Sequence, residues 1–236
     1  MRIDGRAPDA LRPVTIERNF TRHAPGSVLV SFGGTRVICT AMFEERPPAW
    51  LKDTGKGWVT AEYGMLPGSS QERIHRDSVK KGRALEISRL IGRALRAVTD
   101  LRAIGVCQIT IDCDVIQADG GTRTASITGA FVALHDALSH AVRQGYLASV
   151  PLATPCAAVS VGIVDGEPLL DLCYEEDVRA AVDMNLVMDG HGRIIEIQGT
   201  AEQEPFSRDR LNDLLELGEK GIRDLITAQK EALGLA

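Results

Sequence analysis

Residues 119–126 of this chain read Asp-Gly-Gly-Thr-Arg-Thr-Ala-Ser, a run that combines two glycines, three hydroxyl side chains and one arginine. The segment before them, residues 107–117, alternates apolar and polar side chains, as a strand with one buried face does. The segment after them, residues 126–142, repeats apolar side chains at helical spacing. The sequence therefore predicts a strand, a loop and a helix in succession, with the amides of residues 121–126 at the helix N-terminus.

A loop of this composition is suited to holding phosphate. Free N–H groups and the positive end of the helix dipole attract an anion at a helix N-terminus. Gly120 and Gly121 allow the backbone to approach a ligand closely, and Arg123 offers a planar, permanently charged donor group. Hydroxyl donors are supplied by Thr122, Thr124 and Ser126. The same residues also fit a Gly-Gly turn followed by a Ser/Thr helix cap, so both interpretations stay open.

The composition is that of a soluble globular protein. The chain has 236 residues, of which 44% are hydrophobic and 25% are charged. No apolar run approaches the roughly 20 residues that span a bilayer, and the first residues lack the apolar core of a signal peptide. We therefore expect a cytoplasmic protein with no membrane partner.

Cysteines and histidines give no metal signature. The five cysteines are scattered without CxxC spacing, and four lie in apolar segments that resemble strands, which predicts buried thiols without disulfides. The five histidines form no HExxH motif. These patterns argue against a zinc hydrolase.

Charge is unevenly distributed along the chain. The net charge is −5, yet residues 52–96 carry ten Lys/Arg against five Asp/Glu. Residues 165–220 carry fifteen Asp/Glu against five Lys/Arg. This polarity is compatible with a basic surface for a polyanion and a separate carboxylate cluster, although solvated helix faces produce the same pattern.

The periodicity predicts two similar halves, each with strands followed by a helix. Predicted strands cover residues 14–19, 27–32, 35–42, 58–63 and 107–117 and, in the second half, 156–164, 168–173, 182–188 and 194–198. Further helices are expected at residues 83–98 and 207–233, and a polar, mobile loop at residues 66–82. No linker separates the halves, so we predict an α+β fold in one compact domain, residues 1–236.

Two pairs of aspartates are candidates for acid or metal chemistry. Asp177 lies in the acidic turn 174–177, and Asp183 shares one face of its predicted strand with Asn185. Carboxylate and amide oxygens suit Mg²⁺, and one aspartate can instead serve as a general acid. Asp112 and Asp114 form an equally good alternating pair, and the residue pattern does not rank the two.

Two long motifs, residues 82–96 and 111–129, closely resemble the ribonuclease PH family. Similar stretches occur in the same order at residues 6–13, 26–40, 57–67, 170–177, 183–185 and 197–206. The resemblance implies the ribonuclease PH fold, which is similar to domain 2 of ribosomal protein S5. It also implies a phosphorolytic 3′-to-5′ exoribonuclease, a tRNA nucleotidyltransferase that trims precursor tRNA and other RNA 3′ ends. Inorganic phosphate is then the co-substrate, nucleoside diphosphates are released, and the reverse reaction adds nucleotides.

Site roles follow from the resemblance, motif by motif. It implies phosphate binding by Arg83, Gly121, Thr122 and Arg123. It places the catalytic, Mg²⁺-associated pair at Asp177 and Asp183, which decides between the two aspartate pairs. It implies a homohexamer, a trimer of dimers, with RNA held by Arg73 and Arg76.

The chain departs from the family pattern at a few positions near the RNA-binding loop. Gly68 stands where an arginine is common, Ala84 where a threonine is usual, and the loop at residues 76–83 is shorter than expected. None of these is an inferred phosphate ligand, so the departures bear on the binding of RNA.

Three other classes of protein remain alternatives. A non-catalytic ring subunit of an exosome-like assembly would share the fold but lack the phosphate ligands and the acidic pair, both of which are present here. A hydrolytic metal-dependent nuclease would require more Asp, Glu and His ligands. A nucleotide kinase is disfavoured because GxxxxGK[ST] is absent.

Overall fold

The computed structural model describes residues 2–44, 48–51, 53–77, 82–202 and 204–235. Its strands are β1 (Val14–Arg18), β2 (Gly26–Phe32), β3 (Thr35–Glu44), β4 (Trp58–Met65), β5 (Gln108–Gln117), β6 (Cys156–Val164), β7 (Glu167–Leu170), β8 (Val182–Asp189) and β9 (Ile194–Ala201). Its helices are the 3₁₀ turn η1 (Ala49–Leu51) and the α-helices α1 (Gly82–Ala97), α2 (Thr122–Arg143), α3 (Tyr174–Arg179) and α4 (Arg208–Leu233).

The N-terminal half forms a five-stranded sheet in the order β1-β2-β3-β5-β4. β4 runs parallel to β5, and the other pairs are antiparallel. The predicted hairpin is confirmed: Phe32 pairs with Thr35 on either side of Gly33 and Gly34. The alternation predicted for β5 is also confirmed, because its apolar face is buried at Ile109, Ile111, Cys113 and Val115.

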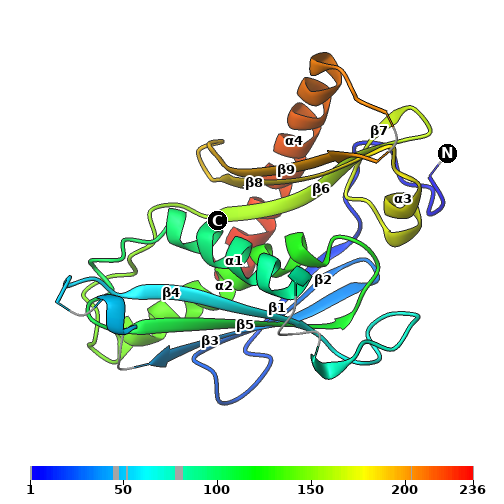
Figure 1. Cartoon of the computed structure of the whole chain (residues 1–236). Coiled ribbons are helices and arrows are strands. Elements are labelled where there is room, and N and C mark those ends of the chain that lie inside the picture. The colour runs from blue at the N-terminus through cyan, green and yellow to red at the C-terminus, as the bar shows by residue number, and fades with distance from the viewer. Residues whose placement is uncertain (1, 45–47, 52, 78–81, 203, 236) are drawn as a thin grey trace.

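Helices α1 and α2 cover one face of this sheet and lie between it and the second sheet (Figure 1). α2 buries most of its 22 residues, since it contacts both sheets. It begins at Thr122, four residues before the start predicted by its apolar spacing. The strand–loop–helix order around residues 119–126 is confirmed.

The second half forms a four-stranded antiparallel sheet in the order β7-β6-β8-β9. α4 packs on its outer face, where an added Cβ on Gly218 would lie 2.8 Å from the Leu186 side chain and 3.5 Å from Val161. Side chains alternate along β6 and β8, so Ser160 and Asn185 lie on the opposite face. That inner face is turned toward α2.

Two segments around residue 171 differ from the prediction. The strand predicted at residues 168–173 ends at Leu170, because Asp171 adopts a left-handed φ of 54° and its buried carboxylate pairs with Arg12. The acidic turn predicted at residues 174–177 is the first part of helix α3. The C-terminal helix agrees with prediction to within one residue, with the Ser207 side chain as its N-cap.

The α+β class is confirmed, and each half contributes a sheet and helices to it. One hydrophobic cluster extends from β2 and β3 through both central helices to β6, β8 and α4. This shared core supports the prediction of one domain, which stays a prediction.

Four cysteines are buried, Cys107 is partly buried, and all five are free thiols. Within the described ranges, no helix has the length and apolar character needed to cross a membrane.

Candidate functional site

The loop between β5 and α2 is built on two consecutive left-handed glycines. Gly120 has φ 73° and Gly121 has φ 63°, a conformation that costs other residues strain. A Cβ on Gly120 would lie 2.6 Å from the carbonyl oxygen of Leu172, so the loop also packs against the backbone before α3. Glycine is required at position 120 for both reasons.

Gly121 is the N-cap of α2. The first helical hydrogen bond runs from the Ala125 N–H to Gly121 O, at 3.0 Å. The amides of residues 122–124 precede it and are the free donors of the helix end. A 22-residue helix adds the positive end of its dipole at the same place. The helix N-terminus predicted from the sequence is therefore present, with its amides in the arrangement that favours an anion.

A pocket opens at this helix end, between α2 and the inner face of the second sheet. It is lined by Arg83, Gly121, Thr122, Arg123, Ser160, Leu172, Asp177, Asp183 and Asn185. All four predicted phosphate-binding residues and both predicted carboxylates are among them, although they come from four different elements. The cavity volume is about 70 Å³, on a scale where roughly 10–15 Å³ holds one water molecule, so a phosphate-sized anion fits.

The hydroxyl groups of the loop have different partners from those expected. Thr124 Oγ1 donates back to Gly121 O, and Ser126 Oγ donates to Thr122 O, both at 2.8 Å. These two side chains are almost fully buried and do not line the pocket. The expectation that they donate to phosphate is therefore wrong, because the helix satisfies them internally. Of the three hydroxyl residues of the loop, Thr122 is the one that lines the pocket, and its Oγ1 lies 2.8 Å from the hydroxyl of Tyr63.

The two carboxylates of the pocket lie on separate elements, Asp177 on α3 and Asp183 at the start of β8. Burial raises the pKa of both. For Asp183, the neighbouring Asp177 charge adds to the effect of burial and the pKa reaches about 6, although Arg123 and Arg83 oppose the rise. Like charges therefore share a partly desolvated site whose arginines stabilise the ionised forms.

Asp112 and Asp114 do not line the pocket. They lie on β5, on the face of the sheet opposite its buried apolar residues. Burial raises the pKa of each, and for Asp112 the neighbouring Asp114, Glu62 and Glu44 raise it further. The geometry thus separates the two aspartate pairs that the residue pattern left equal.

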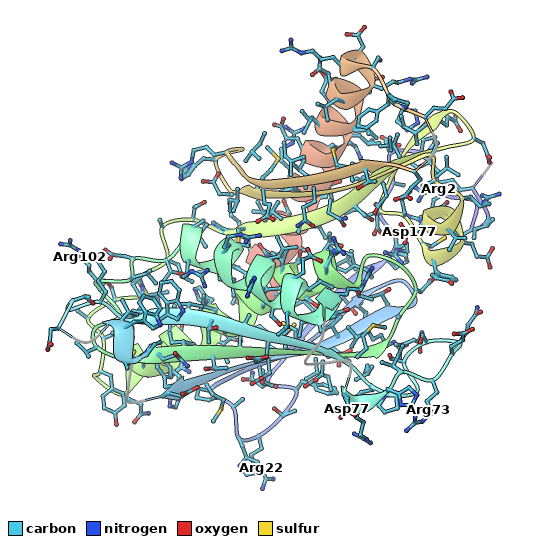
Figure 2. All side chains as sticks on the ribbon, viewed as in Figure 1. Arg2, Arg22, Arg73, Asp77, Arg102 and Asp177 are labelled. Carbon is cyan, nitrogen blue, oxygen red and sulfur yellow. The ribbon has the colours of Figure 1, made fainter. Side chains whose placement is uncertain are left out.

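Arg73 and Arg76 are exposed and do not line the pocket. Figure 2 shows Arg73 on the loop after β4, well apart from Asp177. The loop is ordered at its base, where Ser69 Oγ donates to Leu66 O and Ser69 O accepts from Ala118 N–H. The shortened part of the loop falls mainly on residues 78–81, outside the described residues.

Residues that sequence reasoning did not assign to the site hold the loop in place through hydrogen bonds. Arg12 donates to both carboxylate oxygens of Asp171, with Nη2–Oδ1 at 2.7 Å, and to the carbonyl oxygens of Asp119 and Gly120. The hydroxyl of Thr35 donates to the same Gly120 oxygen at 2.6 Å. A buried ion pair therefore anchors the loop at residues 119–121, which no local pattern could indicate because the partners are far apart in sequence.

The N-terminal segment also fixes α3, the helix that carries Asp177. Arg2 makes two hydrogen bonds to the Glu176 carboxylate, from Nε at 2.8 Å and Nη2 at 2.7 Å, and both side chains are almost fully buried. Arg6 lies 3.6 Å from the same carboxylate and donates to Asp171 O. Figure 2 shows Arg2 close to α3.

Fold and pocket together define an α+β protein with a phosphate-sized anion site facing two carboxylates. The family model of the 3′ exoribonuclease family matches this chain with its domain 1 at residues 10–139 and with its domain 2 at residues 154–221. These spans cover most of the chain. The protein belongs to the 3′ exoribonuclease family.

Similar proteins with assigned names agree with this placement. The chain is 57% identical over 237 residues to "Ribonuclease PH" of Corynebacterium efficiens, with 99% of this chain and 97% of that protein covered. It is also 57% identical to "Ribonuclease PH" of Corynebacterium kroppenstedtii, with 99% and 93% covered. The resemblance inferred from the motifs is confirmed.

Solved structures show the same fold at lower identity. A chain of the Archaeoglobus fulgidus exosome with RNA bound to the active site superposes with a TM-score of 0.81 at 22% identity, covering 95% of this chain and 91% of that chain. Rice (Oryza sativa) Rrp46 superposes with a TM-score of 0.76 at 20% identity, covering 98% of both chains. These likenesses confirm the fold class.

Proposed function

We propose that this protein is a phosphorolytic 3′-to-5′ exoribonuclease whose reaction takes place in the pocket at the N-terminus of α2. The observation that carries the proposal is the composition of that pocket. The central helices contribute free helix amides, Arg83 and Arg123, whereas α3 and β8 contribute Asp177 and Asp183. An anion-binding end and a carboxylate pair are what a phosphate nucleophile and a departing oxygen require.

Inorganic phosphate is the nucleophile in this reaction. One of its oxygens attacks the phosphorus of the terminal phosphodiester, the bond from that phosphorus to the 3′ oxygen breaks, and a nucleoside diphosphate leaves. The shortened RNA retains a 3′ hydroxyl, whose proton comes from the site or from the phosphate itself. The amides of α2, with Arg83 and Arg123, neutralise crowded phosphate oxygens and orient the attack in line.

The pocket also fits Mg²⁺, which typically uses one or two carboxylates together with phosphate oxygens and water. Asp177 and Asp183 would hold the ion. The raised pKa of Asp183 reflects its burial and then the like charge of Asp177, and a cation would relieve that repulsion. The described residues hold no group of three or more Asp, Glu, His or Cys side chains suited to a metal, so phosphate oxygens of the substrate and water would complete the coordination. When bound, the ion supplies positive charge at the departing oxygen.

The substrate is RNA with a free 3′ end, and precursor tRNA is the proposed natural substrate. Arg73 and Arg76 are exposed beyond the pocket, as residues that contact an RNA backbone must be. We further propose a homohexameric ring and a cytoplasmic location. The relatives named Ribonuclease PH support the substrate, and the likeness to chains of archaeal exosomes supports an assembly of several subunits.

A non-catalytic ring subunit of an exosome-like assembly is the second candidate, since the fold is shared with chains of archaeal exosomes. The pocket argues against it, because a subunit that only binds RNA has no need of Arg83, Arg123, Asp177 and Asp183 around one cavity. The 57% identity to proteins named Ribonuclease PH favours the enzyme as well.

Product identity tests the proposal directly. The purified protein is incubated with Mg²⁺ and a 3′-extended tRNA transcript, with and without inorganic phosphate, and the released mononucleotides are identified. Nucleoside diphosphates that appear only with phosphate establish phosphorolysis. Nucleoside monophosphates released without phosphate overturn the mechanism, and RNA binding without release favours the non-catalytic subunit.

A further inference from the structure

Two residues outside the pocket contact the guanidinium group of Arg123. Its Nη1 donates to Gln198 Oε1 at 2.9 Å, and its Nη2 lies 3.7 Å from Glu86 Oε2. The Arg123 side chain is 17% exposed, whereas that of Glu86 is 45% exposed. By its distance, the Gln198 contact is a hydrogen bond. The Glu86 contact is a longer ion pair, which water screens because Glu86 is exposed.

Gln198 lies on the pocket side of the second sheet. Its Cα pairs with that of Asn185 on β8, which in turn pairs with that of Ser160 on β6. Residues paired across antiparallel strands share a face, and both Ser160 and Asn185 line the pocket. Gln198 extends this row by one strand and reaches Arg123 from it.

The orientation of the Gln198 amide is determined by two carboxylates. Its Nε2 donates to Glu86 Oε1 at 3.0 Å and to Glu196 Oε1 at 3.1 Å. Carboxylates only accept hydrogen bonds, so the NH₂ group must face them, and the opposite orientation would oppose oxygen to oxygen. Oε1 is consequently left facing Arg123.

Glu196 is itself fixed by an arginine. Arg93 on α1 makes two hydrogen bonds to its carboxylate, from Nε at 3.0 Å and from Nη2 at 2.7 Å. Bidentate pairs of this kind have a defined geometry. A continuous set of contacts therefore runs from Arg93 through Glu196 and Gln198 to Arg123, and it joins α1, β9 and α2.

A neutral amide is well suited to this position. A carboxylate at residue 198 would also hold Arg123, but it would offset the positive charge that attracts an anion and would face Glu86 and Glu196. We propose that Gln198 is a positioning residue, which orients the Arg123 guanidinium toward the phosphate pocket without neutralising it. This inference rests on the proposed function, because it assumes that phosphate is the anion that binds there.

Phosphate binding by the RNA-free protein tests the inference separately from the reaction. Isothermal titration calorimetry gives the Kd for inorganic phosphate of wild type, Gln198→Met and the matched control Gln108→Met. Gln108 is also a strand glutamine whose Nε2 donates to a carboxylate, that of Glu44, and it lies outside the pocket. We expect Gln198→Met to raise the Kd about tenfold, the weight of one hydrogen bond to a charged group, and Gln108→Met to leave it unchanged.

Non-additivity distinguishes positioning from a general structural role. In the Arg123→Lys background the planar fork is absent, so Gln198→Met should raise the Kd less than about twofold. Equal effects in both backgrounds, or a wild-type Kd in Gln198→Met, overturn the inference while leaving the proposed function intact. A wild-type protein that binds no phosphate overturns both. Nucleotide release without phosphate, with the Kd pattern as expected, overturns the reaction alone.

Discussion

The positive charge of Arg123 acts both at the N-terminus of α2 and on the carboxylates of Asp177 and Asp183. It lies at the start of α2, where the helix dipole is positive, and its charge lowers the pKa of Asp177 and Asp183, partly offsetting the effect of burial. The same guanidinium is thus placed to stabilise phosphate and to favour the ionised forms of the two carboxylates.

Replacing Arg123 by alanine should abolish most phosphate-dependent turnover. Loss of one preorganised charged donor typically costs about 10²–10³-fold in rate, and we expect kcat/KM to fall by this amount with the fold retained. Steady-state kinetics with varied phosphate and circular dichroism provide the measurement. Arg143→Ala, at the exposed C-terminal end of the same helix, is the control and should behave as wild type. Undiminished turnover in Arg123→Ala would remove this residue from the site.

The hydroxyl group of Tyr63 should contribute measurably to the free energy of unfolding. Tyr63 is 2% exposed, and its hydroxyl shares a 2.8 Å hydrogen bond with Thr122. Tyr63→Phe should lower the free energy of unfolding by about 1 kcal/mol, since a buried hydroxyl loses its partner. Urea denaturation measures this difference. Tyr146→Phe, at a tyrosine that is 81% exposed, should leave the free energy of unfolding unchanged. Equal stability of Tyr63→Phe and wild type would contradict the expectation.

The loop after β5 and helix α3 depend on each other through Gly120. The added methyl of Gly120→Ala meets the Leu172–Tyr174 backbone at 2.6–2.8 Å, in addition to the strain of a φ of 73°. We expect a loss of at least about 1–2 kcal/mol in stability, with a fall in turnover because α3 and its Asp177 must shift.

The control for this change isolates backbone strain from contact. Gly105 has φ 74°, but nothing lies within 4 Å of an added Cβ there. Gly105→Ala should therefore lose only the strain contribution and keep full activity. Thermal or urea unfolding of the two variants gives the comparison, and equal losses of stability would show that the contact with residues 172–174 is unimportant.

Elements with local signals were predictable from the sequence, and elements held by distant partners were not. The alternation of β5 and the glycines before α2 predict the strand, loop and helix around residues 119–126 because the responsible residues are adjacent. α3 was predicted as a turn because its six residues are too few for a periodic pattern and its stability comes from Arg2, about 170 positions away. Gln198 was missed because its role depends on sheet register. At the level of sequence, only the family resemblance separated Asp177 and Asp183 from Asp112 and Asp114, whereas the pocket geometry separates them directly.

The contact between the N-terminus and α3 predicts a dependence of stability on acid pH. Burial would raise the pKa of Glu176, but the hydrogen bonds from Arg2 and from the Cys173 N–H outweigh it and hold the pKa below its usual range. A depressed folded-state pKa contributes stability that is complete above the unfolded value, about 4.3, and is lost as pH falls through the folded value. The N-terminus should therefore hold α3 less strongly in acid.

Comparison with Glu176→Gln measures this contribution. The difference in free energy of unfolding between wild type and the variant should be largest near pH 6–7 and should narrow as the pH falls below about 4.3. Urea unfolding at a series of pH values supplies the curve. A difference that stays constant from pH 6 to pH 3 would show that Glu176 does not titrate differently in the folded and unfolded protein.

The pocket depends on the packing of both halves. The first half contributes the helix end and Arg83, the second contributes the carboxylates, and the shared hydrophobic core holds them in register (Figure 1). A pocket with room for one phosphate group cannot by itself bind a folded RNA. Arg73 and Arg76 lie outside it, so RNA binding and catalysis should respond separately to mutation.

The double variant Arg73→Ala, Arg76→Ala tests this separation. Removing two phosphate contacts should weaken binding of a tRNA transcript and reduce the slope of log K against log salt by about 0.7–0.9 for each contact. The Kd for inorganic phosphate and the turnover of a short oligonucleotide that ends at the pocket should stay at wild-type values. The matched control is Arg22→Ala, Arg102→Ala, which removes the same charge from exposed positions away from the Arg73 loop (Figure 2). Filter binding at several salt concentrations gives the slopes, and identical slopes for wild type and the Arg73/Arg76 variant would exclude the loop from the RNA path.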